Sequence, residues 1–222
     1  MDARKILIID GHPDPSRERF VHALADAYAR GASGHQVRRL KLSELDIPFL
    51  RSAAEWMTGE PPVAMVAAQT DIAWADHLVI FYPLWLGDVP ALLKAFLEQT
   101  MRPGFALRYR EHGLPEKLLK GRSARVVVTM GMPAFFYRLV YGAHSVKSLE
   151  RNVLRFVGFR PIGRTIIGSV EADADRRREW LEEMARLRSA SASTEPMIVR
   201  PIGRKPTNLN TLRSRLFTLW AP

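Results

Sequence analysis

Residues 11–20, GHPDPSRERF, place one hydroxyl group and two guanidinium groups directly after an apolar run. Ser16, Arg17 and Arg19 carry these groups, and together they could bind a phosphate. The segment contains neither GxGxxG nor a P-loop GxxxxGK followed by Ser or Thr. If a helix starts here, its free backbone N–H groups and its dipole add to an anion site. An N-capping serine on a surface helix with solvated arginines would have the same pattern.

Residues 83–90, PLWLGDVP, are apolar and stiff, whereas a strand-to-helix connection is usually small and polar. In an extended loop of this kind, backbone N–H groups can bind the polar atoms of a flat ring while an indole or a leucine shields one face. Gly87 would let the backbone approach such a ring closely. One interpretation is a platform for an isoalloxazine ring; the other is a helix entry whose Trp85 fills the core or an interface.

Residues 129–144, TMGMPAFFYRLVYGAH, contain two phenols, Tyr137 and Tyr141, and one imidazole in one segment. Tyr137 and His144 could donate hydrogen bonds to a carbonyl oxygen that becomes an alkoxide or phenolate during a reduction. Each of these residue types, taken alone, more often has a structural role. Their presence together matters only if the fold brings this segment next to the other two.

The elements that must position these segments are five apolar strands that alternate with helices. The alternation predicts an α/β fold with a doubly wound parallel sheet, in which ligands bind beyond the carboxyl ends of the strands. All three segments follow a predicted strand, so we expect them at this edge. The predicted strands are residues 5–9, 36–40, 77–82, 124–130 and 164–168, and the predicted helices are residues 17–28, 61–75, 90–100, 145–157 and 173–188.

Composition excludes several kinds of site. The 222 residues include no cysteine, which rules out disulfides, thiolate metal ligands and a cysteine nucleophile. Lys and Arg number 33 against 23 Asp and Glu, giving a net charge of +10. No basic face interleaved with aromatic residues is evident, so we expect no nucleic acid partner; a nucleotide phosphate or an anionic membrane would explain the charge more simply. No apolar stretch approaches ~20 residues, so a cytoplasmic protein is expected.

The last part of the chain differs from the rest. We expect one domain over residues 1–188, which the resemblance described below makes a flavin-binding domain, and a linker with a basic arm over residues 189–222. Residues 196–222 contain basic side chains and no acid, and they end in apolar residues that need burial. We expect the arm to pack across a homodimer. The alternatives are packing on its own domain and peripheral contact with an anionic inner membrane face, where each basic residue adds ~1 kcal/mol to the binding free energy.

Three blocks of sequence together resemble one family: ILIIDGHPDPSRERFVHALADAY, WADHLVIFYPLWLGDVPALLKAFLEQTMRPGFAL and VVVTMGMPAFFYRLVYGAH. They are similar to the flavodoxin-like NAD(P)H:quinone oxidoreductases, which include DT-diaphorase, the bacterial modulator of drug activity and the potassium-efflux ancillary reductases. The resemblance covers about residues 4–188. It implies a five-stranded sheet in the order 2-1-3-4-5, and two-electron hydride transfer from NADPH or NADH through flavin to a quinone-like acceptor by a ping-pong mechanism.

The resemblance also implies roles for individual residues. The segment after the first strand would bind the flavin phosphate, the proline-led segment would support the ring, and the segment after the fourth strand would lie at the other edge of the ring. Tyr137 and His144 would be catalytic, facing the oxygen of the acceptor. FAD is the expected cofactor, and FMN is possible. The candidate cofactor-binding residues are His12, Ser16, Arg17, Arg19, Phe20, Pro83, Leu84, Trp85, Leu86, Thr129, Met130 and Gly131.

Other classes of protein share this fold. Flavodoxin-type electron carriers are usually acidic, whereas this chain is basic. A phospho-acceptor receiver domain needs acids at the ends of the first and third strands, and the third strand ends in Tyr82 and Pro83. The remaining alternative is a flavin-binding regulatory subunit of a membrane transporter, with secondary reductase activity.

Overall fold

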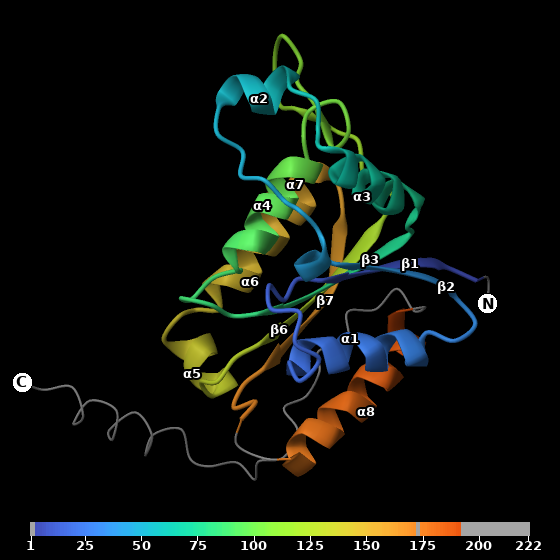
Figure 1. Ribbon diagram of the computed structural model, residues 1–222, viewed down its shortest axis with the longest axis vertical. Helices are drawn as coiled ribbons and strands as arrows, with labels where there is room; N and C mark the ends of the chain where they lie inside the picture. The colour runs from blue at the N-terminus through green and yellow to red at the C-terminus, as the bar shows by residue number, and fades with distance from the viewer. Residues whose placement is uncertain (1–2, 172–173, 192–222) are drawn as a thin grey trace, which may run out of the picture.

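A computed structural model of the chain describes residues 3–171 and 174–191. Five parallel strands form the central sheet in the order β2-β1-β3-β6-β7 (Figure 1). This order confirms the predicted doubly wound 2-1-3-4-5 topology. The strands are β1 (Lys5–Asp10), β2 (Gln36–Lys41), β3 (His77–Pro83), β6 (Ser123–Thr129) and β7 (Arg160–Ile167).

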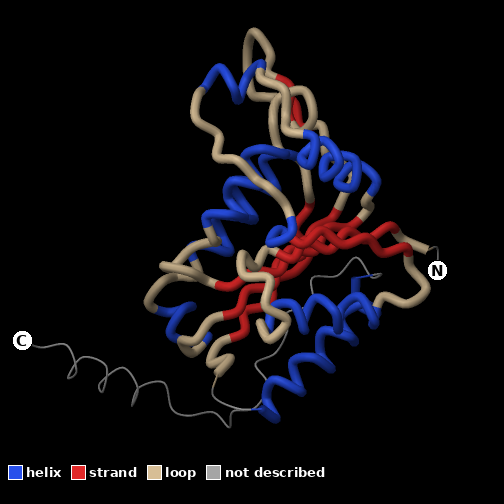
Figure 2. Tube along the Cα trace, viewed as in Figure 1, coloured by secondary structure: helices blue, strands red, loops and turns tan. Residues whose placement is uncertain are grey.

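Helices cover both faces of the sheet (Figure 2). On one face α1 (Phe20–Gly31) packs against α8 (Ala174–Ser191). The other face carries α3 (Val63–Trp74), α4 (Ala91–Thr100), α6 (His144–Ser148), the π-helix η2 (Leu149–Leu154) and α7 (Arg155–Val157). The shorter elements are η1 (Leu42–Glu44), α2 (Ala53–Thr58), α5 (Ala134–Leu139) and the hairpin strands β4 (Leu107–Arg108) and β5 (Glu116–Lys117).

The core forms because the central strands are apolar on both faces, as buried parallel strands must be. In β1, Leu7 and Ile9 enter the core beneath α3 and α4, while Ile6 and Ile8 enter the core beneath α1 and α8. β3 and β6 are buried along their whole length. Among the described residues, no helix is long and apolar enough to cross a membrane.

Several boundaries differ from those predicted. Helix α1 begins at Phe20 rather than at residue 17, which leaves a longer loop after β1. Strand β7 begins at Arg160, four residues earlier than expected. Its first half, residues 160–163, is only partly buried and contains a proline and a glycine, so no apolar run indicates it in the sequence. The helix predicted over residues 145–157 divides into α6, η2 and α7. Helix α8 continues to Ser191, inside the predicted linker, and the predicted basic arm lies outside the described residues.

Candidate functional site

The three segments singled out in the sequence meet at the carboxyl edge of the sheet. Asp10, the last residue of β1, pairs with Phe81 of β3, and Pro83 at the end of β3 pairs with Thr129 at the end of β6. The loops after these strands are therefore neighbours. The expectation that one sheet edge collects all three segments is confirmed.

The first loop leaves the sheet by a close backbone approach at Gly11. Its N–H donates to the Phe81 carbonyl oxygen over 2.7 Å, and a Cβ on Gly11 would lie 2.9 Å from that same oxygen. A larger residue would therefore push β1 away from β3, since a backbone carbonyl cannot rotate aside as a side chain can. Gly11 fixes the point from which residues 12–19 begin.

His12 lies inside this loop and is buried. Its Nδ1 accepts the Asp14 backbone N–H over 3.1 Å, so the ring proton of the neutral form is on Nε2. Burial, and then the neighbouring His22, lower the pKa of His12. Its ring centroid is 5.7 Å from that of Trp85, edge to face. His12 therefore links the first loop to the second and keeps one N–H donor.

Of the side chains predicted to bind a phosphate, Arg19 is held by an acid of the same loop, which also holds the backbone N–H of Ser16. The Asp14 carboxylate accepts the Ser16 backbone N–H over 2.8 Å and the Arg19 Nε–H over 2.7 Å. These two partners, Ser16 first, lower the pKa of Asp14. Arg17 is exposed, and Phe20 opens α1 and packs against the core beneath that helix. The loop is thus organised around an anion, here its own carboxylate.

The proline-led segment was expected to be extended, and this is wrong. Trp85 and Asp88 exchange two backbone hydrogen bonds, of 3.0 and 2.9 Å, which close a tight turn. The two residues inside the turn have positive φ, 48° at Leu86 and 80° at Gly87, as a two-residue hairpin turn requires. The left-handed backbone conformation of Leu86 costs a non-glycine residue roughly 1 kcal/mol or more.

The side chains of this turn are presented to the surface. Leu86 is fully exposed at the tip, and Trp85 is 47% exposed. Pro83 closes β3 and is buried, while Leu84 is half-buried and donates its N–H to the Thr129 carbonyl over 2.7 Å. The turn is therefore tied to β6, and its exposed indole forms an apolar surface beside His12.

The loop after β6 leaves open space beside the turn. Met130 is buried and donates its N–H to the Ile167 carbonyl oxygen over 2.9 Å. Gly131 follows at the surface, and a Cβ built on it would meet nothing within 4 Å. Gly131 therefore borders an open position just beyond the end of β6 that a planar ligand could occupy.

Tyr137 and His144 are not on the same surface. Tyr137 is fully buried, and its hydroxyl has no hydrogen-bond partner of normal geometry among the described residues. Burial raises the pKa of Tyr137, while the nearby Val146 N–H and Ser145 oppose the rise. His144 is exposed at the start of α6. In this conformation only His144 of the predicted pair can meet an acceptor, and a catalytic role for Tyr137 stays a prediction.

The exposed phenol of this loop belongs to Tyr141, which was not among the predicted site residues. Tyr141 is 43% exposed and stacks on Tyr137, with ring centroids 6.4 Å apart. Its carbonyl oxygen accepts the His144 N–H over 3.1 Å. The available signal was a second tyrosine three residues before the histidine, but sequence alone does not tell which of the two tyrosines is buried.

The described residues contain no cluster of acids and histidines that could hold a metal ion. The edge does offer a loop organised around a carboxylate, the exposed indole of Trp85, the open position beside Gly131 and the imidazole of His144. These features fit a flavin: a phosphate end, a flat ring and a face open to a second reactant. The geometry therefore suits redox chemistry through a bound flavin better than acid–base chemistry alone.

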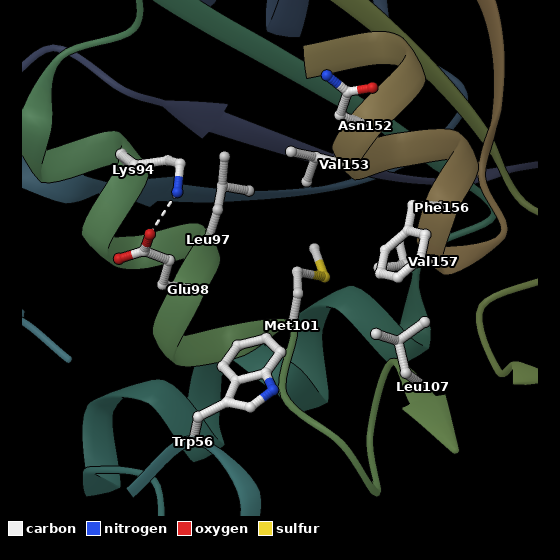
Figure 3. A pocket seen from close by; sticks show the side chains of 10 residues that line it. All are labelled: Trp56, Lys94, Leu97, Glu98, Met101, Leu107, Asn152, Val153, Phe156 and Val157. Carbon is white, nitrogen blue, oxygen red and sulfur yellow. Dashed lines mark hydrogen bonds and ion pairs between the residues drawn. The ribbon is translucent and has the colours of Figure 1, made fainter. Parts of the chain in front are cut away.

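A separate pocket lies between α4, α2 and the η2–α7 segment (Figure 3). Its volume is about 170 Å³, and its walls are mainly apolar, including Trp56, Met101 and Phe156. Lys94 and Glu98 form an ion pair on the α4 wall. None of the lining residues belongs to the three loops, so this pocket is not part of the carboxyl-edge site.

Comparison with known families gives one match that spans most of the chain. The sequence model of the family described as "Flavodoxin-like fold" matches residues 4–189. A protein of Listeria innocua named FMN-dependent NADH:quinone oxidoreductase 2 is 28% identical over 203 residues, covering 79% of this chain and 92% of the relative. An FMN-dependent NADH:quinone oxidoreductase of Nitratidesulfovibrio vulgaris is 27% identical, covering 82% and 97%.

Solved structures have the same fold. Smu.1420 from Streptococcus mutans UA159 superposes with a TM-score of 0.70 at 26% identity, over 83% of this chain and 98% of that protein. An NAD(P)H:quinone oxidoreductase from Methanothermobacter marburgensis gives a TM-score of 0.68 at 23% identity, over 86% and 98%. The three loops described above all lie inside residues 4–189, which the family model matches.

Proposed function

Because the chain belongs to the flavodoxin-like fold family, we propose that it is a flavin-dependent NAD(P)H oxidoreductase that reduces quinone-like acceptors. The observation that carries this proposal is the convergence of three loops at one sheet edge, with the Pro83–Thr129 pairing holding the second and third together. The names of the Listeria and Nitratidesulfovibrio relatives support both the reductase activity and the acceptor class.

The choice of cofactor changes with these comparisons. The sequence favoured FAD, with FMN as the second possibility. The relatives are named FMN-dependent and NADH-using, which favours FMN as the flavin and NADH as the donor. The loop over residues 12–19 suits either flavin, since both carry a phosphate next to the ribityl chain.

When bound, the flavin supplies hydride acceptance and donation; the residues of this chain supply binding, orientation and a proton. His12 and the loop around Ser16 would hold the phosphate end. Trp85 would cover one ring face and exclude water from it. NADH and the acceptor would use the opposite face in turn, in a ping-pong sequence, and His144 would donate to the acceptor oxygen as negative charge develops there.

We also propose that the active form is a homodimer. Large apolar side chains near the site are exposed, and contiguous apolar surface of this kind usually marks an interface. On α5 and the residue after it, Leu139 is 68% exposed and Val140 is 59% exposed. Leu139→Glu should lower the mass measured by light scattering from that of a dimer to that of a monomer, whereas Leu114→Glu, on a distant exposed loop, should not.

The experiment that tests the function begins with the purified, coloured protein. Heat-released cofactor is identified by chromatography with mass spectrometry, and NADH oxidation is followed with menadione as acceptor. Bound FMN together with menadione-dependent NADH oxidation is the expected result. A coloured protein that does not oxidise NADH or NADPH would favour the regulatory subunit instead, and a protein that binds neither FMN nor FAD would overturn the proposal.

A further inference from the structure

The first loop rests on a carboxylate that sequence analysis did not single out. Asp10, at the end of β1, is fully buried. Its carboxylate accepts hydrogen bonds from His22 Nδ1 on α1 over 2.7 Å and from Arg39 Nη2 on β2 over 2.5 Å. It also accepts the His12 backbone N–H over 3.4 Å. One buried acid therefore joins two strands, a helix and the start of the loop.

His22 continues this network into the loop. Its Nδ1 faces the Asp10 carboxylate, and its Nε2 faces the Asp14 backbone carbonyl oxygen at 2.9 Å. Both partners are acceptors only, because neither an ionised carboxylate nor a carbonyl has a proton to give. Both hydrogen bonds form at the same time only if both ring nitrogens donate, which is the doubly protonated, positively charged imidazolium.

The charges around His22 show why that proton matters. The acids that face this network are Asp10 on β1, Asp14 in the loop and Asp26 on α1, and the bases are Arg39 on β2, Arg19 in the loop and His22 itself. His12 also faces His22, with ring centroids 5.3 Å apart, and burial favours its neutral form by lowering its pKa. Three negative and three positive charges cancel. Without the second proton on His22 the cluster carries one net negative charge, which opposes a phosphate.

We propose that His22 is a positioning residue that holds the phosphate loop in place as an imidazolium, and that the loop releases the flavin phosphate when His22 loses its second proton. The loss would break the bond to the Asp14 carbonyl oxygen or to the Asp10 carboxylate, because a neutral imidazole donates only once. If the bond to the Asp14 carbonyl oxygen is lost, Asp14, whose carboxylate holds Ser16 and Arg19, keeps only the hydrogen bond from its N–H to His12 as a tie to the rest of the site. This inference rests on the proposed flavin-binding function and makes flavin retention depend on pH.

The test compares flavin affinity across about pH 5.5 to 8.5, the range in which histidines change charge. FMN and riboflavin are titrated separately by fluorescence quenching, since only FMN carries the phosphate. The variants are His22→Gln, which cannot hold a charge, and His112→Gln, an exposed histidine elsewhere. Because the FMN phosphate also titrates near pH 6, the quantity compared is the ratio of wild-type to variant affinity at each pH.

We expect wild type to bind FMN about tenfold more tightly than His22→Gln at the acidic end, the effect of one hydrogen bond to a charged group. The ratio should fall towards one at the basic end. His112→Gln should follow wild type, and riboflavin should show no such pH dependence. A constant ratio for His22→Gln, or the same pH dependence with riboflavin, would overturn the inference while leaving the proposed function intact.

A second measurement does not depend on any variant. Nitrogen NMR of the ligand-free wild-type protein reports how many protons the His22 ring carries. The expected result is two protons where the ratio of wild-type to His22→Gln affinity is highest, with one lost over the pH range in which that ratio falls. A singly protonated ring throughout that range would overturn the inference. Failure of wild type to bind either flavin at any pH would instead refute the proposed function.

Discussion

His77 offers a quantitative test of how the sheet that carries the site responds to pH. It is the first residue of β3 and is buried, with Nδ1 2.8 Å from the Ser123 Oγ and no partner for Nε2 among the described residues. Burial, and then the nearby Arg125, lower the pKa of His77 from 6.5 to about 3. The folded protein therefore keeps this ring neutral in conditions in which the unfolded chain protonates it.

The sign and the size follow from this difference. Between about pH 6.5 and 3 the unfolded chain binds one more proton than the folded protein at this position. The contribution of His77 to the free energy of unfolding is therefore fully present above pH 6.5 and is lost as the pH falls through this window. Each pH unit within this window costs roughly 1.4 kcal/mol. Lowering the pH from 7 to 5 should therefore remove about 2 kcal/mol of unfolding free energy through His77 alone.

Urea unfolding followed by tryptophan fluorescence at pH 7, 6 and 5 measures this effect. The variant is His77→Asn, whose amide can still meet Ser123 but cannot titrate. The variant should be less stable at pH 7 and should lose about 2 kcal/mol less than wild type on going to pH 5. His112→Gln, an exposed control, should lose as much as wild type. Parallel losses in wild type and His77→Asn would refute the reasoning.

Three further predictions concern the site and its support. Trp85→Arg should abolish flavin binding by fluorescence quenching with an unchanged circular dichroism spectrum, because the indole is half-exposed and the core does not depend on it. His144→Gln combined with Tyr141→Phe should lower kcat on the order of ten- to a thousand-fold at unchanged flavin content; if Tyr137→Phe replaces Tyr141→Phe with equal effect, the buried phenol is the catalytic one. Arg125→Met should raise the unfolding free energy in urea by about 1–3 kcal/mol, because the buried guanidinium has no partner for Nε and Nη1 among the described residues; a less stable variant would show that its charge is compensated.

The sequence predicted the strands correctly where they are buried along their whole length. Strands β1, β3 and β6 are buried on both faces, so each appears as an unbroken apolar run. Strand β7 was recognised only in its second half, since none of the four residues of its first half is fully buried and two of them are proline and glycine. Helical periodicity also predicted one helix over residues 145–157, but it does not distinguish an α-helix from the π-turns of η2.

The turn at residues 85–88 was missed for a different reason. Two-residue hairpin turns are usually signalled by Asn-Gly or Asp-Gly, because both central residues need positive φ. Here the first of the two positions is Leu86, a residue that rarely adopts φ of 48°. The two bonds between Trp85 and Asp88 and the bond from Leu84 to Thr129 hold this conformation, and the last of these exists only because β3 and β6 are paired.

The buried anchor of the loop over residues 11–19 could not be found in the sequence, and the reason is physical. Asp10 ends an apolar run and His22 lies inside an amphipathic helix, so each pattern is complete without assigning them a function. Their meeting depends on where β1 leaves the sheet, which Gly11 fixes, and on the charge that Arg39 brings from β2. The net charge of +10 does not predict this site either, since the charges around the loop cancel. A single proton on His22 then decides whether the loop presents a neutral or a negative surface to a phosphate, however basic the rest of the chain is.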